Sequence, residues 1–193
     1  AVWLDVIPQR EQEAVMKKVL GGAPMSPASY YFRFYVARAM VHAGLGDEYV
    51  AQLEPWRKML AMGLSTWAEN PEPTRSDSHA WSAHPTLDLA GIVAGIGPGA
   101  PGFKSVAITP HLGPRQQVEA ARPTPHGLVE VSYRKEQGRW AAEMTQGRLA
   151  PPFTSRSQPL MGRQFSRSDR TESMVGGVGA RTACCVMQTN SNG

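Results

Sequence analysis

The sequence has few cysteines and no long apolar run. Cys184 and Cys185 are adjacent, so a disulfide between them would be strained, and they have no metal-site spacing. They leave the redox compartment open. No apolar run approaches the roughly 20 residues that a membrane span needs, and no membrane association is expected. The first residues, Ala1–Asp5, lack an initiator methionine and a basic segment. They do not resemble a signal peptide and are typical of the interior of a longer protein.

Four residue types are missing from the end of the chain. Residues 146–193 contain no lysine, tryptophan, tyrosine or isoleucine, although residues 1–145 use all four. The segment is rich in arginine, serine, glycine and proline and has no sustained hydrophobic period. We therefore predict that it is disordered. The abrupt change of composition indicates out-of-frame translation or a foreign extension, and a native disordered tail is the alternative.

The positive charge of the chain is confined to this tail. The whole sequence carries a net charge of +4, with 20 Lys and Arg against 16 Asp and Glu. Residues 1–145 hold 14 basic and 14 acidic residues, whereas residues 146–193 hold six arginines and two acids. The first 145 residues are therefore neutral overall. Nucleic-acid binding, which needs a basic surface on the folded part, is not expected.

Hydrophobic periodicity predicts four helices in the first half of the chain. Apolar residues recur at helical spacing, and glycines follow the first three segments as stop signals. Ser26 and Pro27 are placed as a helix cap and first helical residue. Pro55 and Pro85 are expected to distort the third and fourth helices. The predicted helices cover 10–20, 28–43, 48–61 and 79–93.

The period then changes from that of a helix to that of a strand. Alternating apolar residues predict strands at 103–109, 128–133 and 139–144, with a turn at 136–138. The Gly- and Pro-rich residues 95–102 are expected to be a linker. The fold class is therefore mainly α with a C-terminal antiparallel β region.

The loop before the fourth helix has the densest mixture of carboxylates, histidine and tryptophan in the chain. Glycosidases use two carboxyl groups on opposite sides of the glycosidic bond, and aromatic faces bind the C–H faces of sugars. Arginine, aspartate and histidine can hydrogen-bond sugar hydroxyls. The composition is suggestive only, because surface loops often have it. These residues are Trp67, Glu69, Glu72, Arg75, Asp77, His79, Trp81 and His84.

The order of residues adds a more specific indication. About residues 25–145 resemble glycoside hydrolase family 78, the α-L-rhamnosidases and related six-hairpin enzymes. The resemblance stays in register across the change from helices to strands. It is carried by LSTWAE at 64–69, PEPTRSDSHAW at 71–81, VAGI at 93–96, APGF at 100–103, VAITPHLG at 106–113 and PHG at 125–127.

The resemblance implies an architecture. Residues 1–97 would be the C-terminal part of an (α/α)6 catalytic barrel, and residues 98–145 would begin a C-terminal β-sandwich. The barrel would be partial and the sandwich incomplete, because four helices cannot close a barrel of twelve. The substrate would be a rhamnose-containing glycoside, and no cofactor or metal is expected.

The resemblance also implies roles for individual residues. Glu69 matches the general base that activates water in inverting hydrolysis, and His79 matches a sugar-binding histidine. Trp67 and Trp81 would form subsite walls, or else belong to the core. Arg75 and Asp77 would hydrogen-bond the sugar, or else pair with each other. His84, His111 and His126 are assigned no role, and no segment matches the region of the family's general acid.

Two other functions compete with an enzyme fragment. The chain could instead be a non-catalytic carbohydrate-binding or structural module that retains a sugar-facing loop. It could also be the inactive product of a damaged gene, which the tail favours. The oligomeric state, the exact sugar and the aglycone are left open by the sequence.

Overall fold

The computed structural model divides into two compact units. It describes residues 1–22, 24, 26–71, 73–147, 172–174 and 185–188, the last two segments by their backbone only. The helical unit comprises Ala1–Gly95 and Pro110–Pro114. The sheet unit comprises Ile96–Thr109 and the chain from Arg115 onward. The described residues form four α-helices, five short 3-10 or π segments and two small antiparallel sheets.

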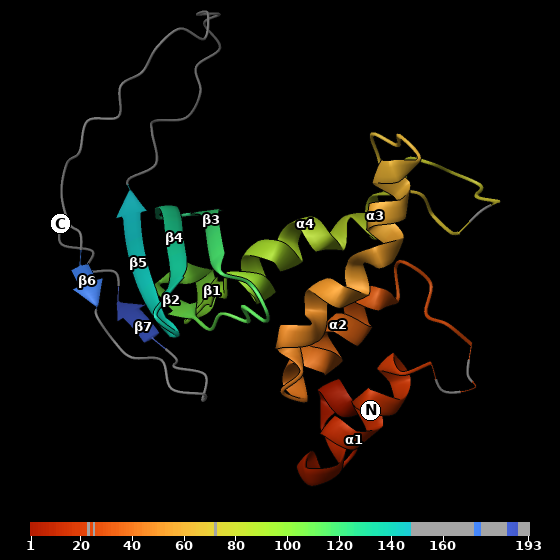
Figure 1. Ribbon diagram of the computed structural model, residues 1–193, viewed down its shortest axis with the longest axis horizontal. Helices are drawn as coiled ribbons and strands as arrows, with labels where there is room; N and C mark the ends of the chain where they lie inside the picture. The colour runs from red at the N-terminus through yellow and green to blue at the C-terminus, as the bar shows by residue number, and fades with distance from the viewer. Residues whose placement is uncertain (23, 25, 72, 148–171, 175–184, 189–193) are drawn as a thin grey trace, which may run out of the picture. The chain divides into compact units, whose positions relative to one another are not determined.

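After the first, the α-helices are shorter than the periodicity predicts (Figure 1). The helix predicted at 10–20 is confirmed by α1, Gln9–Leu20. The second helix, α2, begins only at Arg33 and ends at His42. The cap predicted at Ser26 is wrong, because the Ser29 hydroxyl accepts the Phe32 N–H at 3.3 Å and the Ser29 carbonyl accepts the Arg33 N–H.

Two prolines divide the remaining helical segments. The predicted third helix is a 3-10 segment, Gly46–Leu53, followed by α3, Glu54–Ala61, with Pro55 in the first turn of α3. The predicted fourth helix is a 3-10 segment, a short α4 and a π turn, at Ala80–Ala83, His84–Asp88 and Leu89–Val93. The first turn of a helix accommodates proline, whereas the interior does not, because proline lacks an N–H and clashes with the preceding turn. Each proline therefore lies in the first turn of a new α-helix.

The core of the helical unit is built from methionines and aromatic residues. The buried side chains include Met16, Met40, Tyr49, Trp56 and Met59. Residues 110–114 rejoin this unit, because the His111 N–H bonds to the carbonyls of residues 92 and 93 and the Gly113 N–H bonds to Asp47. The opposite side of α2 leaves aromatic rings exposed. None of the helices in the described part of the chain is long and apolar enough to cross a membrane.

Before Gly147, the sheet unit contains one hairpin and one further strand that the sequence predicts, and two strands that it does not. β4, Gly127–Glu136, pairs with β5, Arg139–Gly147, around a turn in which Gln137 and Gly138 have positive φ. β3, Gln117–Thr124, pairs with β4 over its whole length. β1, Ile96–Pro98, pairs with β2, Ser105–Ile108. The linker predicted at 95–102 is therefore wrong at residues 96–98.

The two sheets have the strand orders β1-β2-β7 and β3-β4-β5-β6. β6, Glu172–Met174, and β7, Cys185–Gln188, come from the segment predicted to be disordered. The rest of that segment beyond Gly147 lies outside the described residues, so disorder and a foreign origin of the tail stay predictions. A closed barrel or sandwich is not formed by the part of the chain that the structure describes.

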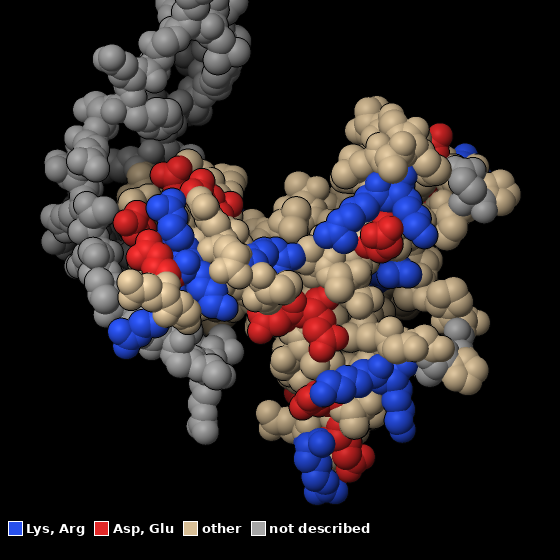
Figure 2. Space-filling view, viewed as in Figure 1, with Lys and Arg blue, Asp and Glu red and all other residues tan. Residues whose placement is uncertain are grey.

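Buried side chains lie on one face of the larger sheet. Val129, Val131 and Tyr133 alternate along β4 with more exposed residues, and all three are buried. From β3, the Arg122 guanidinium bonds to the carbonyl of Ile96, so it ties this sheet to β1. On the face shown in Figure 2, acidic and basic residues are interspersed within each unit.

Candidate functional site

The loop that follows α3 is closed on itself by backbone hydrogen bonds. The His79 N–H donates to the Trp67 carbonyl and the Glu69 N–H donates to the Ser76 carbonyl, each at 2.8 Å. The Thr66 hydroxyl donates to the Asp77 carbonyl. These bonds join the two ends of the loop, so Trp67 and Glu69 on one side face residues 76–79 on the other. Two residues that the sequence singles out, Glu69 and His79, are thereby brought close together.

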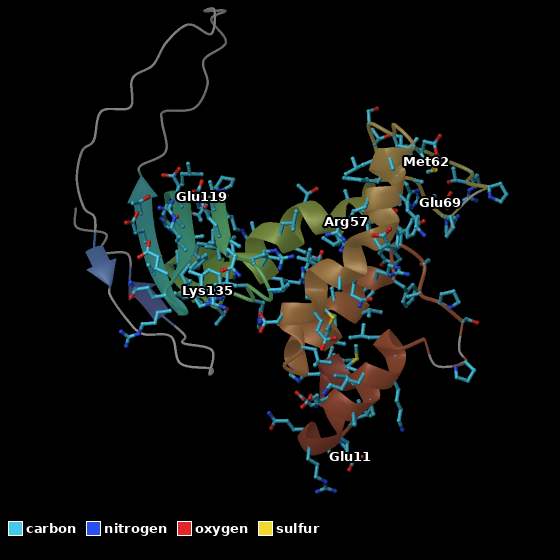
Figure 3. All side chains as sticks on the ribbon, viewed as in Figure 1. Glu11, Arg57, Met62, Glu69, Glu119 and Lys135 are labelled. Carbon is cyan, nitrogen blue, oxygen red and sulfur yellow. The ribbon has the colours of Figure 1, made fainter. Side chains whose placement is uncertain are left out.

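Glu69 makes an ion pair with Arg75 inside this loop (Figure 3 labels Glu69). Arg75 Nε donates to Glu69 Oε2 at 2.8 Å, and Arg75 Nη2 bonds to Oε1. The Glu69 side chain is 15% exposed, whereas that of Arg75 is 81% exposed. Arg75 therefore covers a carboxylate that is otherwise largely enclosed, and it does not pair with Asp77 as the sequence had allowed.

The ion pair keeps Glu69 in its charged form. The hydrogen bond from Arg75 holds the pKa of the Glu69 carboxyl below its ordinary value. Partial burial opposes this shift, and the nearby charges of Arg75 and His79 add to it. A carboxylate that must accept a proton from water has to be ionised, and Glu69 meets that requirement. Its oxygens are, however, already engaged by Arg75.

The other predicted site residues take different positions. His79 is half-buried and its ring lies edge-on to the Trp81 ring, with centroids 5.9 Å apart. Trp67 is half-buried beside the loop closure, and the side chain of Asp77 is on the exposed side. Glu72 lies outside the described residues. Whether these groups contact one sugar stays a prediction.

Trp81 belongs to an aromatic cluster with the start of α2. Its ring lies 4.6 Å from that of Tyr31, and Tyr31 meets Tyr35 edge-on at 5.7 Å. The hydroxyls of Tyr31 and Tyr35 are 3.0 Å apart. Trp81 remains 64% exposed, so it is not a core residue.

Nothing in the sequence indicated that the carboxylate of Asp88 is buried. Asp88 is fully buried, and its oxygens bond to Arg38 at 2.5 Å, to the Tyr49 hydroxyl at 3.1 Å and to His84 Nδ1 at 2.7 Å. We call these four residues the Asp88 hub. Burial beside the Asp88 charge raises the pKa of the Tyr49 hydroxyl far above its ordinary value. The spacing of His84 and Asp88, four residues apart, was a visible signal, but nothing in it showed that the pair is buried.

The remaining histidines have structural surroundings. The His111 ring packs against Gly46, and burial lowers its pKa, with Asp47 opposing. His126 Nε2 lies 3.1 Å from the carbonyl of Gly102. Among the residues that the structure describes, no group of three or more His, Cys, Asp or Glu side chains could hold a metal ion.

Comparison with known proteins finds a similarity over one segment of the chain. No curated protein matches the chain as a relative. Residues 95–145 match the family model of the bacterial alpha-L-rhamnosidase C-terminal domain. The match covers β1 to β4 and most of β5, and it ends before the tail. It does not include the Glu69 loop. The resemblance to α-L-rhamnosidases is confirmed over this segment: residues 95–145 are similar to the C-terminal domain of the bacterial enzymes.

Proposed function

We propose that this chain is part of an inverting α-L-rhamnosidase-like glycoside hydrolase and carries the general-base half of its active site. The observation that carries the proposal is the enclosed, ionised Glu69 in a loop closed beside His79. The family match of the neighbouring segment supports the reaction class. The substrate would be a rhamnose-containing glycoside.

In this proposal Glu69 removes a proton from a water molecule. The water oxygen then attacks the anomeric carbon from the side opposite the leaving group, and the glycosidic C–O bond breaks. A second carboxyl group protonates the leaving oxygen. In inverting enzymes the two carboxyl groups lie about 6.5–9.5 Å apart. Arg75 would have to release at least one Glu69 oxygen for the water, which its 81% exposed side chain can do by moving into solvent.

The general base is tested by Glu69→Gln in a complete homologous enzyme. The amide keeps the shape of the side chain but cannot accept the proton. Turnover should fall by about 10²–10⁴-fold, the usual size of a general-base effect, while sugar binding changes little. Glu54→Gln, at an exposed position of α3, is the matched control and should keep the turnover of the wild type. Turnover of Glu69→Gln within a few-fold of wild type would exclude this role.

The chain by itself is expected to hydrolyse aryl α-L-rhamnosides poorly. Inversion needs an acid as well as a base, and only the base has a candidate here. The assay compares the purified chain with its Glu69→Gln variant. Robust release of the aryl group, abolished in the variant, would mean that the chain also holds the acid, and Glu72 and Asp77 would then be examined.

The two bonds from Arg75 favour one alternative, a non-catalytic carbohydrate-binding or structural module. In that case the role of Glu69 is structural: its ion pair with Arg75 stabilises the closed conformation of the loop. Glu69→Gln and Arg75→Gln should then have the same effect on stability, and their effects should not add in the double variant. Under the general-base proposal, Arg75→Gln in the complete enzyme raises the pH at which the acidic limb of kcat/KM appears, because it removes the hydrogen bond that lowers the pKa of Glu69.

A further inference from the structure

The Glu69 loop, residues 64–79, is attached to α3 at both of its ends. At the near end, the backbone N–H of its first residue donates to the Met59 carbonyl of α3 at 3.1 Å. Beyond the far end, the chain continues as the 3-10 segment that contains Ser82. The indole N–H of Trp56, in α3, donates to the Ser82 carbonyl at 2.8 Å. Helix α3 is therefore a common base for the two ends of the loop.

Packing fixes the Trp56 side chain where it makes this bond. Trp56 is only 4% exposed, and its ring centroid lies 5.5 Å from that of Tyr30 and 5.0 Å from that of His84. Its acceptor is equally enclosed, because Ser82 is fully buried. A buried carbonyl that loses its donor is unfavourable, since water cannot replace the lost bond. The indole N–H is therefore the group that satisfies the Ser82 carbonyl and holds it against α3.

A series of backbone hydrogen bonds leads from this contact to Glu69. The Ser82 N–H donates to the His79 carbonyl at 3.0 Å, and the His79 N–H donates to the Trp67 carbonyl at 2.8 Å. Two residues after Trp67, the Glu69 N–H donates to the Ser76 carbonyl and closes the loop a second time. Each bond fixes one peptide group with respect to the next. A movement of Ser82 away from α3 would therefore displace His79 and weaken the closure of the loop.

We propose that Trp56 is a positioning residue for the Glu69 loop. By holding the Ser82 carbonyl, its indole N–H keeps His79 in the place where it closes the loop. The closed loop in turn keeps the Glu69 carboxylate paired with Arg75. The effect of Trp56 on Glu69 passes through these backbone bonds.

Trp56→Phe tests this role, because it removes the N–H and keeps an aromatic ring. Hydrogen exchange of the full chain measures the His79 and Glu69 amides, with the α2 amides as the reference for the helical unit. Relative to α2, both loop amides should exchange at least about tenfold faster, since opening of the loop exposes them. Met59→Leu, at a buried position of the same helix, is the matched control. It changes the packing but not the indole N–H, so it should affect the loop and α2 amides alike.

A second measurement separates positioning from stability. The hydrogen bond from Arg75 lowers the pKa of the Glu69 carboxyl, and this bond needs the closed loop. NMR titration of Trp56→Phe should therefore give a Glu69 pKa closer to the ordinary value, whereas Met59→Leu should keep that of the wild type. The consequence for catalysis rests on the proposed function. In the complete homologous enzyme, Trp56→Phe should lower kcat at least about tenfold and change KM much less, because the base is misplaced.

Unchanged exchange of the His79 and Glu69 amides in Trp56→Phe, or an unchanged Glu69 pKa, would overturn the inference. If Trp56→Phe also removes the protection of α2, 3-benzothienylalanine at position 56 takes its place, and the same two outcomes decide. This side chain has the shape of tryptophan but lacks the N–H. If Glu69→Gln keeps its turnover in the complete enzyme while Trp56→Phe still opens the loop, the proposed general base is wrong and the role of Trp56 in the loop stands.

Discussion

The helical unit buries a carboxylate, whereas the larger sheet keeps its glutamates on an exposed strand face. Asp88 is fully buried, and its partners Arg38 and Tyr49 lie 50 and 39 residues away along the chain. In the sheet, Glu119, Glu130 and Glu143 occupy the exposed face of three neighbouring strands, opposite the buried valines of β4. Figure 3 labels Glu119 on this sheet. The strand period alone separates polar from apolar residues in the sheet. The Asp88 hub exists only because distant segments meet.

The largest test of this contrast is Asp88→Asn. It removes the charge that balances Arg38 and disturbs the bonds to Tyr49 and His84. Loss of one partner from a buried ion pair typically costs about 3–5 kcal/mol, so most of the stability of the helical unit should be lost. Hydrogen exchange of the α2 and α4 amides measures the effect, with β4 amides as the internal reference.

Glu54→Gln is the control, because Glu54 is exposed on α3 of the same unit. It should change stability by no more than about 0.5 kcal/mol. An equal loss of protection in β4 after Asp88→Asn would mean that the two units unfold together.

The corresponding test in the sheet is Val131→Ala. Val131 is 4% exposed at the centre of β4, and its truncation should cost about 2–3 kcal/mol by loss of apolar burial and creation of a cavity. Glu130→Ala, one residue earlier on the exposed face, should cost much less. Chemical denaturation followed by Trp140 fluorescence compares the two. Similar losses would contradict the assignment of faces.

A smaller effect is expected for Gly46→Ala in the helical unit. A Cβ at this position would come within 2.4 Å of the His111 ring, which links residues 110–114 to this unit. The clash should cost about 1–2 kcal/mol, measured by thermal unfolding. Gly97→Ala in the sheet is the control, since its Cβ would meet only the Ala107 carbonyl at 3.9 Å. Adding His111→Ala to Gly46→Ala should recover part of the loss, and no recovery would place the strain elsewhere.

The smallest effect is a pH dependence from His111. Burial lowers the pKa of its imidazole in the folded state below the value of about 6.5 in the unfolded chain. Between these two values the unfolded chain binds more protons, so stability should fall as pH drops below 6.5 and should level off below the folded pKa. Urea denaturation from pH 7.5 to 5 measures this, and His111→Gln should flatten the dependence. A variant with the same pH profile as wild type would show that other groups cause it.

The predictable parts of the fold depend on residues close together in sequence. α1 and the β4–β5 hairpin were predicted because their periods and the turn at Gly138 are local signals. β3 was missed because Gln117–Thr124 contains two alanines, a glutamate and Pro123, which favour strands poorly. The strand forms because β4 supplies a partner, and it is an edge strand, where proline is tolerated.

The candidate site divides in the same way. The residue types of a sugar-handling loop were visible in the sequence. The partner of Arg75 was not. Six residues separate Glu69 from Arg75, and only the closure of the loop selects Glu69 over the nearer Asp77. The aromatic cluster was equally hidden, because it joins Tyr31 and Tyr35 to Trp81, about 50 residues later.

By itself the sequence determined the change from helices to strands, the neutrality of residues 1–145 and the resemblance to α-L-rhamnosidases confirmed over residues 95–145. These are properties of local period, composition and residue order. The tertiary structure alone decided which charge balances Asp88, what pairs with Glu69 and which aromatic ring packs against Trp81. Each of these depends on burial and on contacts between segments far apart in the chain, and a buried group's surroundings are set by whichever segment packs against it.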